Sequence, residues 1–144
     1  MIHEMNLKSA AARLGAEYIG GDCHFNQVRI DSRAVEPGDL FVAIKGERFD
    51  AHDFLGDVAE RGASGFVLER ENTDIDLPQM KVADSVKALG QLAALARGDF
   101  AGKMLAITGS SGKTTVKGMS ASILEQKGKT HATAGNLNNH IGVP

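Results

Sequence analysis

One short segment of the chain has the residue types and the spacing to bind a nucleoside triphosphate. Residues 107–115 read Ile-Thr-Gly-Ser-Ser-Gly-Lys-Thr-Thr. A glycine turn at a helix start presents backbone N–H groups and the positive end of the helix dipole to an anion. Lys113 can reach the outer phosphates, and the Thr114 hydroxyl can bind a phosphate-bound Mg²⁺. The predicted nucleotide-binding residues are Thr108, Gly109, Ser110, Ser111, Gly112, Lys113, Thr114 and Thr115.

The segment departs from the general phosphate-loop pattern at one position. That pattern has a glycine six residues before the lysine, where this chain has Ile107. The flanking sequence supports the motif, because residues 104–107 are apolar and predict a buried strand. The residues after the turn predict an amphipathic helix, with an apolar face made of Val116, Met119, Ile123 and Leu124. The alternative is a Gly-Lys-Thr string that only starts a helix and binds nothing.

Composition narrows the class of protein. The chain has 144 residues, 42% of them hydrophobic, with 16 basic and 18 acidic side chains and a net charge of −2. This balance argues against a nucleic-acid surface, which normally carries a basic patch. No apolar run is long enough to span a membrane, the first residues lack the layout of a signal peptide, and Cys23 is alone. We therefore expect a soluble cytoplasmic monomer with Cys23 as an unreactive thiol.

Alternating helical and strand patterns predict an α/β fold in two domains, 1–83 and 84–144. In the first domain we expect two helices, from Asn6 to Gly15 and from Asp53 to Gly62. We also expect a pair of strands at 17–19 and 27–30, buried strands at 40–44 and 66–68, and a short last strand at 80–83. In the second we expect a helix from Asp84 to about Arg97 and strands at 104–107 and 129–133 around the helix of the glycine turn. Two strands and two helices cannot cover a parallel sheet, so we expect an incomplete nucleotide-binding domain.

Two further segments of the first domain could bind a ligand. Asp31-Ser32-Arg33 follows a predicted strand, where a hydroxyl and a guanidinium suit a diphosphate or a sugar. The alternative is an exposed turn with a local Asp–Arg ion pair. His52 lies at a predicted helix start and can donate to a uracil, ribose or phosphate oxygen. The alternative is a capping arrangement of His52 with Asp53.

The end of the chain is rich in asparagine. Asn136, Asn138 and Asn139 follow the second strand of the nucleotide unit, at the edge where open α/β sheets bind ligands. Their amides can bind a polar ligand through fixed donors and acceptors. Asparagine also tolerates turn conformations, which explains one or two of the three without a ligand. We interpret the segment as a substrate-binding one.

Together these segments resemble the Mur ligase family. The matching pieces are Asp31-Ser32-Arg33, residues 37–43, residues 46–54 and the turn at 108–115. The short phosphate loop is the form that this family shows, and the resemblance covers the whole chain. Gly118 stands where the family leads us to expect an acidic residue. Within the family, the asparagine segment favours the ligase that adds D-alanyl-D-alanine.

The resemblance implies a fold, an activity and ligands. A small α/β domain would bind the UDP part of a nucleotide sugar through Ser32, Arg33 and His52, and the start of a P-loop parallel-sheet domain would bind ATP and Mg²⁺. ATP would phosphorylate the terminal carboxylate of UDP-N-acetylmuramoyl-tripeptide, and the amine of D-alanyl-D-alanine would attack the acyl phosphate, in peptidoglycan precursor synthesis. Lys113 would be catalytic by neutralising developing charge, and Thr114 would hold Mg²⁺. The three asparagines would line the junction between the two substrate sites.

The resemblance also places further metal ligands and a modified lysine beyond Pro144, so we expect the 144-residue chain alone not to catalyse ligation. Three alternatives stay open. One is the related ligase that adds a diamino acid one step earlier. Another is a UDP-sugar-binding module without catalysis. The third is a general phosphate-loop ATPase or GTPase, in which Ser32 has no role.

Overall fold

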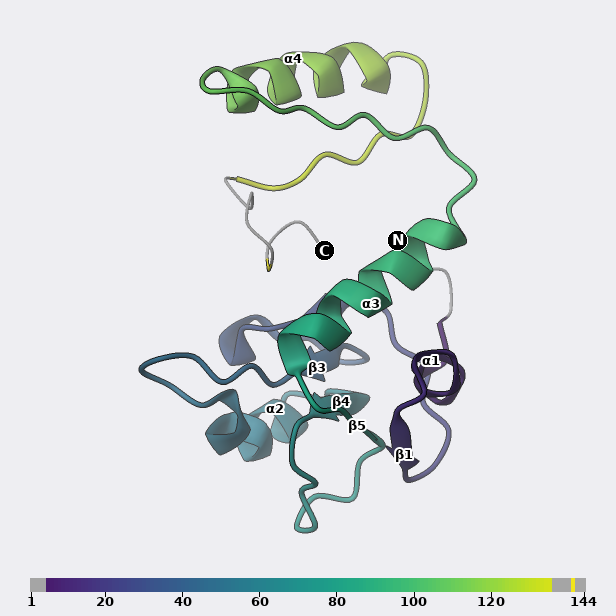
Figure 1. The fold of residues 1–144 in the computed structure, drawn as a ribbon, viewed down its shortest axis with the longest axis vertical. Coiled ribbons are helices and arrows are strands. Elements are labelled where there is room, and N and C mark those ends of the chain that lie inside the picture. Colours follow the sequence, from purple (N-terminus) through teal and green to yellow (C-terminus); the bar gives the residue numbers. More distant parts are fainter. Residues whose placement is uncertain (1–4, 136–140, 142–144) are drawn as a thin grey trace. The chain divides into compact units, whose positions relative to one another are not determined.

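The computed structural model describes residues 5–135 and 141, which fall into two compact units, Met1–Gly98 and Asp99–Pro144. Figure 1 shows the elements of both units. Those of unit 1 are α1 (Leu7–Leu14), β1 (Glu17–Ile19), β2 (Val28–Arg29), the 3₁₀ turn η1 (Ser32–Ala34), β3 (Leu40–Val42), the 3₁₀ turn η2 (Ala51–Phe54), α2 (Leu55–Glu60), β4 (Gly65–Leu68), β5 (Gln79–Lys81) and α3 (Ser85–Gly98). None of the described helices is long and apolar enough to cross a membrane.

The sheet of unit 1 is mostly parallel. Its strand order is β1-β5-β4-β3-β2, with β2 to β5 parallel and β1 antiparallel to β5. Every residue of β3 and β4 is buried, as expected of parallel strands that are covered on both faces. The predicted α/β fold class is therefore confirmed.

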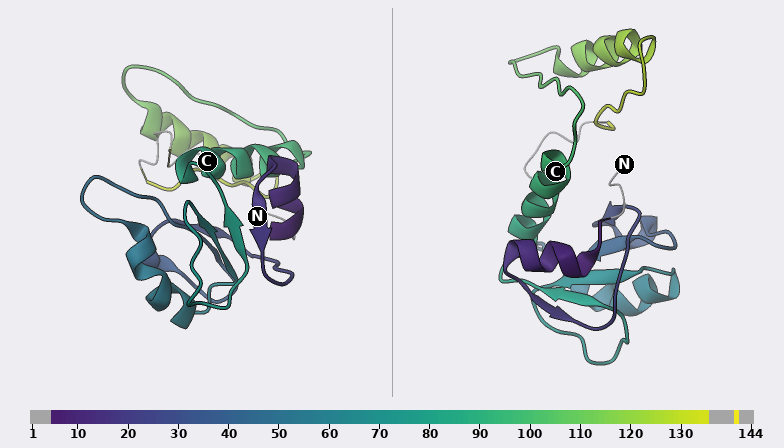
Figure 2. Two further views of the ribbon diagram at one scale, coloured as in Figure 1. Left: turned by 60° about the horizontal axis from the view of Figure 1, so that its bottom comes forward. Right: turned by 90° about the vertical axis from the view of Figure 1, so that its right-hand side faces the viewer.

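Helices cover both faces of this sheet, as the views in Figures 1 and 2 show. On one face, Val58 of α2 belongs to a buried cluster with Phe41 and Phe66. Successive strand residues point to opposite faces, so Gly65 points to the other face. There a Cβ on Gly65 would lie 3.1 Å from Cδ2 of Leu7, which shows how closely α1 packs against β4. Helix α3 packs against α1 and β4.

Local signals set the bounds of α1. The side chain of Asn6 caps the helix by accepting a hydrogen bond from the Ser9 N–H at 3.0 Å. Gly15 ends it in the left-handed conformation, with φ at 66°. Both ends agree with the sequence prediction, because each depends only on residues next to the helix.

Three predictions for unit 1 differ from the structure. The strands predicted as a pair, β1 and β2, lie at opposite edges of the sheet. The helix predicted from Asp53 begins instead as the 3₁₀ turn η2, which Asp50 caps through the His52 N–H. The helix at 85–98, which the sequence groups with the second domain, packs against α1 and β4, so the two units divide after Gly98.

Unit 2 has one helix among its described residues, α4 (Lys113–Glu125). This helix was predicted, but the strands predicted at 104–107 and 129–133 are not formed. A strand needs a neighbour to satisfy its N–H and C=O groups, and no described segment of unit 2 pairs with either stretch. The apolar residues are accordingly exposed, with Met104 at 62% and Ile123 of α4 at 63%.

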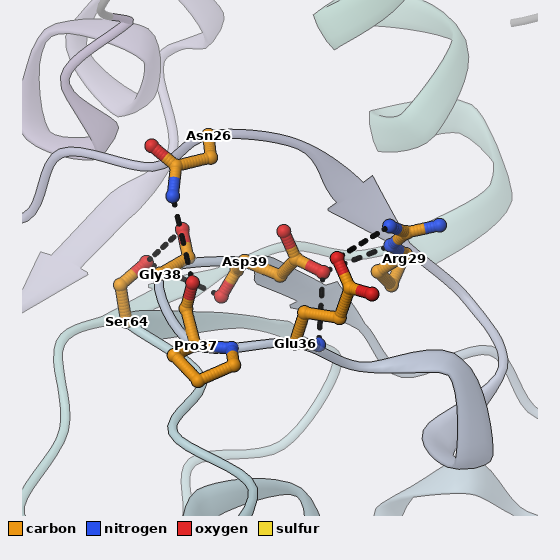
Figure 3. A network of polar contacts seen from close by, with 7 residues as sticks. All are labelled: Asn26, Arg29, Glu36, Pro37, Gly38, Asp39 and Ser64. Carbon is orange, nitrogen blue, oxygen red and sulfur yellow. Dashed lines mark hydrogen bonds and ion pairs between the residues drawn. The ribbon is translucent and has the colours of Figure 1, made fainter.

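A polar network joins the starts of the parallel strands, and Figure 3 shows it from close by. Its centre is Asp39, which is 2% exposed and precedes β3. One carboxylate oxygen accepts from Nε of Arg29 at 2.8 Å and from the Glu36 N–H at 3.0 Å. The Asp39 carbonyl accepts from the N–H of Ser64, just before β4, at 2.8 Å. Asp39 therefore ties β2, the turn before β3 and the start of β4 together.

We expect Asp39→Ala to lower the free energy of unfolding by about 2–3 kcal/mol, because it leaves Nε of Arg29 and the Glu36 N–H without their acceptor. Urea unfolding followed by circular dichroism measures this. The matched control is Glu36→Ala, since that carboxylate is 72% exposed and lies 3.5 Å from Arg29. We expect it to change stability by about 0.5 kcal/mol or less. Equal losses in the two variants would contradict the central role of Asp39.

Candidate functional site

The glycine turn leads directly into α4. Gly112 caps the helix with φ at 75°, a left-handed conformation that glycine adopts without steric cost, and its carbonyl accepts from the Val116 N–H at 2.9 Å. Residues 108–112 are exposed. The first N–H groups of a helix have no partner within that helix. The turn and the helix start can therefore bind a phosphate through backbone N–H groups.

Lys113, the predicted catalytic residue, is folded over this turn. Its Nζ donates to the Gly109 carbonyl oxygen at 2.6 Å. A phosphate oxygen carries a charge and is a stronger acceptor than a carbonyl. A phosphate bound in the turn can therefore replace the Gly109 carbonyl as the acceptor for Lys113.

Lys117, a second lysine of α4, was not among the residues predicted from the sequence to belong to the site. Nζ of Lys117 donates to the carbonyl oxygens of Thr133 at 2.6 Å and Gly135 at 2.7 Å. Lys117 lies four residues after Lys113 and so shares its side of the helix. That spacing was the available signal, although it does not name the two carbonyls. Through these bonds the segment before the asparagines is tied to the first half of α4.

Two further groups of site residues were predicted, the metal ligand Thr114 and the three asparagines near the end of the chain. Across residues 5–135 and 141, no group of three or more His, Cys, Asp or Glu side chains could hold a metal ion. Thr114 is exposed at the second position of α4. That its hydroxyl holds Mg²⁺ stays a prediction. The predicted substrate-binding residues Asn136, Asn138 and Asn139 lie outside the described residues.

In unit 1, the predicted Ser32 and Arg33 form the turn η1 after β2. The Arg33 guanidinium makes a two-pronged ion pair with Asp31, with Nε 2.9 Å from Oδ1 and Nη2 2.7 Å from Oδ2. Asp31 also caps the turn through the Arg33 N–H at 3.0 Å. The Arg33 side chain holds the pKa of Asp31 down at about 2, chiefly through these hydrogen bonds. The local Asp–Arg pair, the alternative reading of this motif, is present.

Two adjoining hollows lie beside the η1 turn. The first, of about 420 Å³, is lined by Ser32, Arg33, Phe49, Phe54, Asp57 and Arg61. The second, of about 370 Å³, is lined by Ile30, Asp31, Ser32, Phe41, Ile44, Gly46, Phe49, Ala51 and Phe54. Phe49 belongs to both and is 73% exposed, on a turn that a 2.9 Å hydrogen bond from the Gly46 N–H to the Phe49 carbonyl closes. An exposed ring on a closed turn can stack against a flat ligand.

His52 does not reach these hollows with a free ring nitrogen. Its side chain is 3% exposed, Nδ1 lies 2.7 Å from Oδ1 of Asp50, and Nε2 accepts from the Glu69 N–H at 3.2 Å. Both ring nitrogens are thus hydrogen-bonded within unit 1, where they hold η2 against the end of β4, and the role of His52 in substrate binding stays a prediction. The His52 N–H bonded to Asp50 is the main reason that the pKa of Asp50 is lowered. The capping partner is thus Asp50 and not Asp53.

Comparison with known proteins extends these observations over the whole chain. Residues 24–97 match the family described as "Mur ligase family, catalytic domain", and residues 107–144 match "Mur ligase middle domain". The chain is 53% identical over 131 residues to the UDP-N-acetylmuramoyl-tripeptide–D-alanyl-D-alanine ligase of Escherichia coli (strain K12). That alignment covers 91% of this chain and 29% of the relative.

Solved structures agree with the sequence matches. A crystal structure of MurF from Acinetobacter baumannii is 40% identical with a TM-score of 0.88, over 99% of this chain and 32% of that chain. The MurF ligase from Thermotoga maritima in complex with ADP is 39% identical with a TM-score of 0.71, over 83% of this chain and 28% of that one. The chain therefore spans less than a third of the length of each of these relatives.

Because His52 joins η2 to the end of β4, replacing its side chain should destabilise both elements. We expect His52→Ala to reduce the free energy of unfolding by about 2–4 kcal/mol, since a buried ring and two hydrogen bonds are lost. Exchange of the Glu69 amide hydrogen should become faster, which NMR measures residue by residue. His24→Ala, at an exposed position, is the control and should change neither. Unchanged exchange at Glu69 in the His52 variant would disprove this role.

The ion pair of Asp31 has a defined dependence on pH. The carboxyl should titrate with a pKa of about 2 rather than 3.8, and Arg33→Ala should return it towards 3.8. Because the folded-state pKa is the lower one, the stabilisation is complete above the ordinary pKa and is lost as the pH falls through about 2. Carboxyl-carbon NMR during acid titration follows this group. Arg13→Ala removes a positive charge from α1 that does not contribute to the low pKa of Asp31, and it should leave the Asp31 midpoint in place.

Proposed function

Because this chain belongs to the Mur ligase family, we propose that it provides the substrate- and ATP-binding part of a ligase that joins D-alanyl-D-alanine to UDP-N-acetylmuramoyl-tripeptide. The proposal rests on the observation that one chain contains both the glycine turn before α4 and the hollow lined by Ser32 and Arg33. The name of the Escherichia coli relative supports this choice within the family. We place the reaction in the cytoplasm, where ATP is available.

The proposed chemistry solves the problem that a carboxylate is a poor electrophile. One carboxylate oxygen of the tripeptide attacks the γ-phosphorus of ATP, which releases ADP and forms an acyl phosphate. The amine of D-alanyl-D-alanine then attacks the carbonyl carbon, phosphate leaves, and the amine loses a proton as the amide forms. Charge builds up on the phosphate oxygens during the first step, next to the turn that holds Lys113.

Residues of the turn have distinct parts in this proposal. Backbone N–H groups between Gly109 and Gly112 cradle the phosphates, with Thr108, Ser110, Ser111 and Thr115 around them. Lys113 neutralises the charge that develops on the transferred phosphoryl group. Thr114 holds Mg²⁺, which, when bound, neutralises the β- and γ-phosphate oxygens. Ser32 and Arg33 bind the UDP diphosphate, and Asn136, Asn138 and Asn139 line the junction of the two sites.

Isothermal titration of the chain with UDP-N-acetylmuramoyl-tripeptide and with ATP plus Mg²⁺ tests the proposal, which requires that both bind. Binding of the sugar nucleotide alone would favour a UDP-sugar module without catalysis. Binding of ATP alone, with a sugar-nucleotide affinity that Ser32→Ala does not change, would favour a general phosphate-loop ATPase. A third outcome, tighter binding of a dipeptide nucleotide than of the tripeptide one, would indicate the ligase one step earlier.

Lys113→Met should weaken ATP binding about tenfold or more, because a charge-assisted hydrogen bond is worth about 1.5–3 kcal/mol. Its affinity for the sugar nucleotide should not change, since Lys113 belongs to unit 2. Titration calorimetry measures both affinities. Lys127→Met, which removes an exposed lysine beyond the other end of α4, is the matched control and should bind ATP as the parent chain does. Equal ATP affinities in the two variants would remove Lys113 from the phosphate site.

A further inference from the structure

The two hollows beside η1 differ in chemistry, although they share Ser32, Phe49 and Phe54. Apart from Ser32 and Asp31, the smaller one is lined by apolar side chains and glycine. The larger one adds three charged residues, Arg33, Asp57 and Arg61. A ligand that fills both would have a flat apolar part at one end and an anionic part at the other. The two phenylalanines lie at the boundary between these parts.

The two arginines of the larger hollow are not equally available to an anion. The Arg33 guanidinium is already bound by both oxygens of Asp31, at 2.9 and 2.7 Å. The Arg61 guanidinium forms neither an ion pair nor a hydrogen bond with any residue that the structure describes. An incoming phosphate meets an ion pair at Arg33, whereas the Arg61 guanidinium has no carboxylate within ion-pair distance among the described residues.

The backbone of Arg61 is fixed at the end of α2, and the residue lines the larger hollow. It continues the last turn of α2, with its backbone N–H donating to the Asp57 carbonyl at 3.1 Å. Residues four apart lie on one side of a helix, so Asp57 and Arg61 face the hollow together. The Asp57 carboxylate repels a bare phosphate and accepts from a hydroxyl. This wall therefore favours a ligand with both hydroxyl donors and a phosphate, such as a nucleotide, over inorganic phosphate.

We propose that Arg61 provides the unpaired positive charge that binds the phosphate of the nucleotide, while the base lies against Phe49 and Phe54 in the apolar part. This inference rests on the proposed function, because it assigns a residue to the UDP-binding role of unit 1. It assigns different roles to the two arginines of the larger hollow. Arg33 shapes the η1 turn through Asp31 and keeps its remaining N–H groups for the ligand, and Arg61 supplies the free charge.

The experiment compares uridine with UDP, which differ only in the diphosphate, by titration calorimetry of the 144-residue chain. Arg61→Ala should weaken UDP binding about tenfold, as expected for one charge-assisted contact, and should change uridine binding less than about twofold. Arg61→Lys, which keeps the charge, should recover most of the UDP affinity. Phe49→Ala should weaken uridine and UDP by the same factor, about tenfold for a lost stacking contact.

The control is Lys8→Ala, which removes one exposed positive charge from α1, outside the hollows. Its UDP affinity should equal that of the parent chain. If Arg61→Ala binds UDP as tightly as the parent chain, or loses uridine and UDP affinity equally, Arg61 is not the phosphate-binding charge, while the proposed function stands. If the parent chain binds no UDP, the proposed function of unit 1 fails and the inference with it.

Discussion

Strand β3 is buried on both faces, and the arrangement of unit 1 follows from this constraint. Leu40, Phe41 and Val42 have no exposed surface, so apolar cover is needed on each side of the sheet. Helix α2 supplies it on one face, and α1 with α3 supplies it on the other. Because β2 and β3 are parallel, their carboxyl ends lie at the same edge. The turns η1 and η2 follow these two strands, which brings Ser32 and the Phe49–Phe54 segment together there.

Unit 1 is closely packed around Gly65 of β4. A Cβ on this residue would lie 2.9 Å from the Pro78 carbonyl oxygen and 3.1 Å from Sγ of Cys23, so no larger residue fits without displacing backbone. The same packing buries Cys23, with its Sγ 3.2 Å from the Ser64 carbonyl oxygen. Burial raises the pKa of the Cys23 thiol, which reduces the reactive thiolate. The lone cysteine is thus a packing residue, in agreement with the sequence prediction.

The sequence predicted best the features whose causes are local. The caps of α1 and the glycine turn before α4 depend on neighbouring residues, and both were predicted. Strand pairing in the sheet depends on residues that are distant in the sequence. Strand β1 was expected beside β2, but Tyr18 of β1 lies opposite Met80 of β5. Nothing near residue 18 encodes that distant partner. For the same reason the sequence could not show that the Glu69 N–H donates a hydrogen bond to Nε2 of His52.

The cations of the two candidate binding regions differ in what holds them, and this decides what each gains from an anion. Arg33 is held by a carboxylate, so a phosphate near it must compete with a charged acceptor or use the N–H groups that Asp31 leaves. Lys113 is held by the neutral carbonyl of Gly109, a weaker acceptor than phosphate. Its intramolecular bond keeps the ammonium over the turn before a ligand arrives, which lowers the entropy lost on binding. The exchange of a carbonyl for a phosphate is therefore favourable at Lys113, whereas the exchange of Asp31 for a phosphate at Arg33 brings little. In the proposed site, Arg33 would therefore act through the shape of the turn and through the N–H groups that Asp31 leaves, and the cations without a carboxylate partner would act through charge.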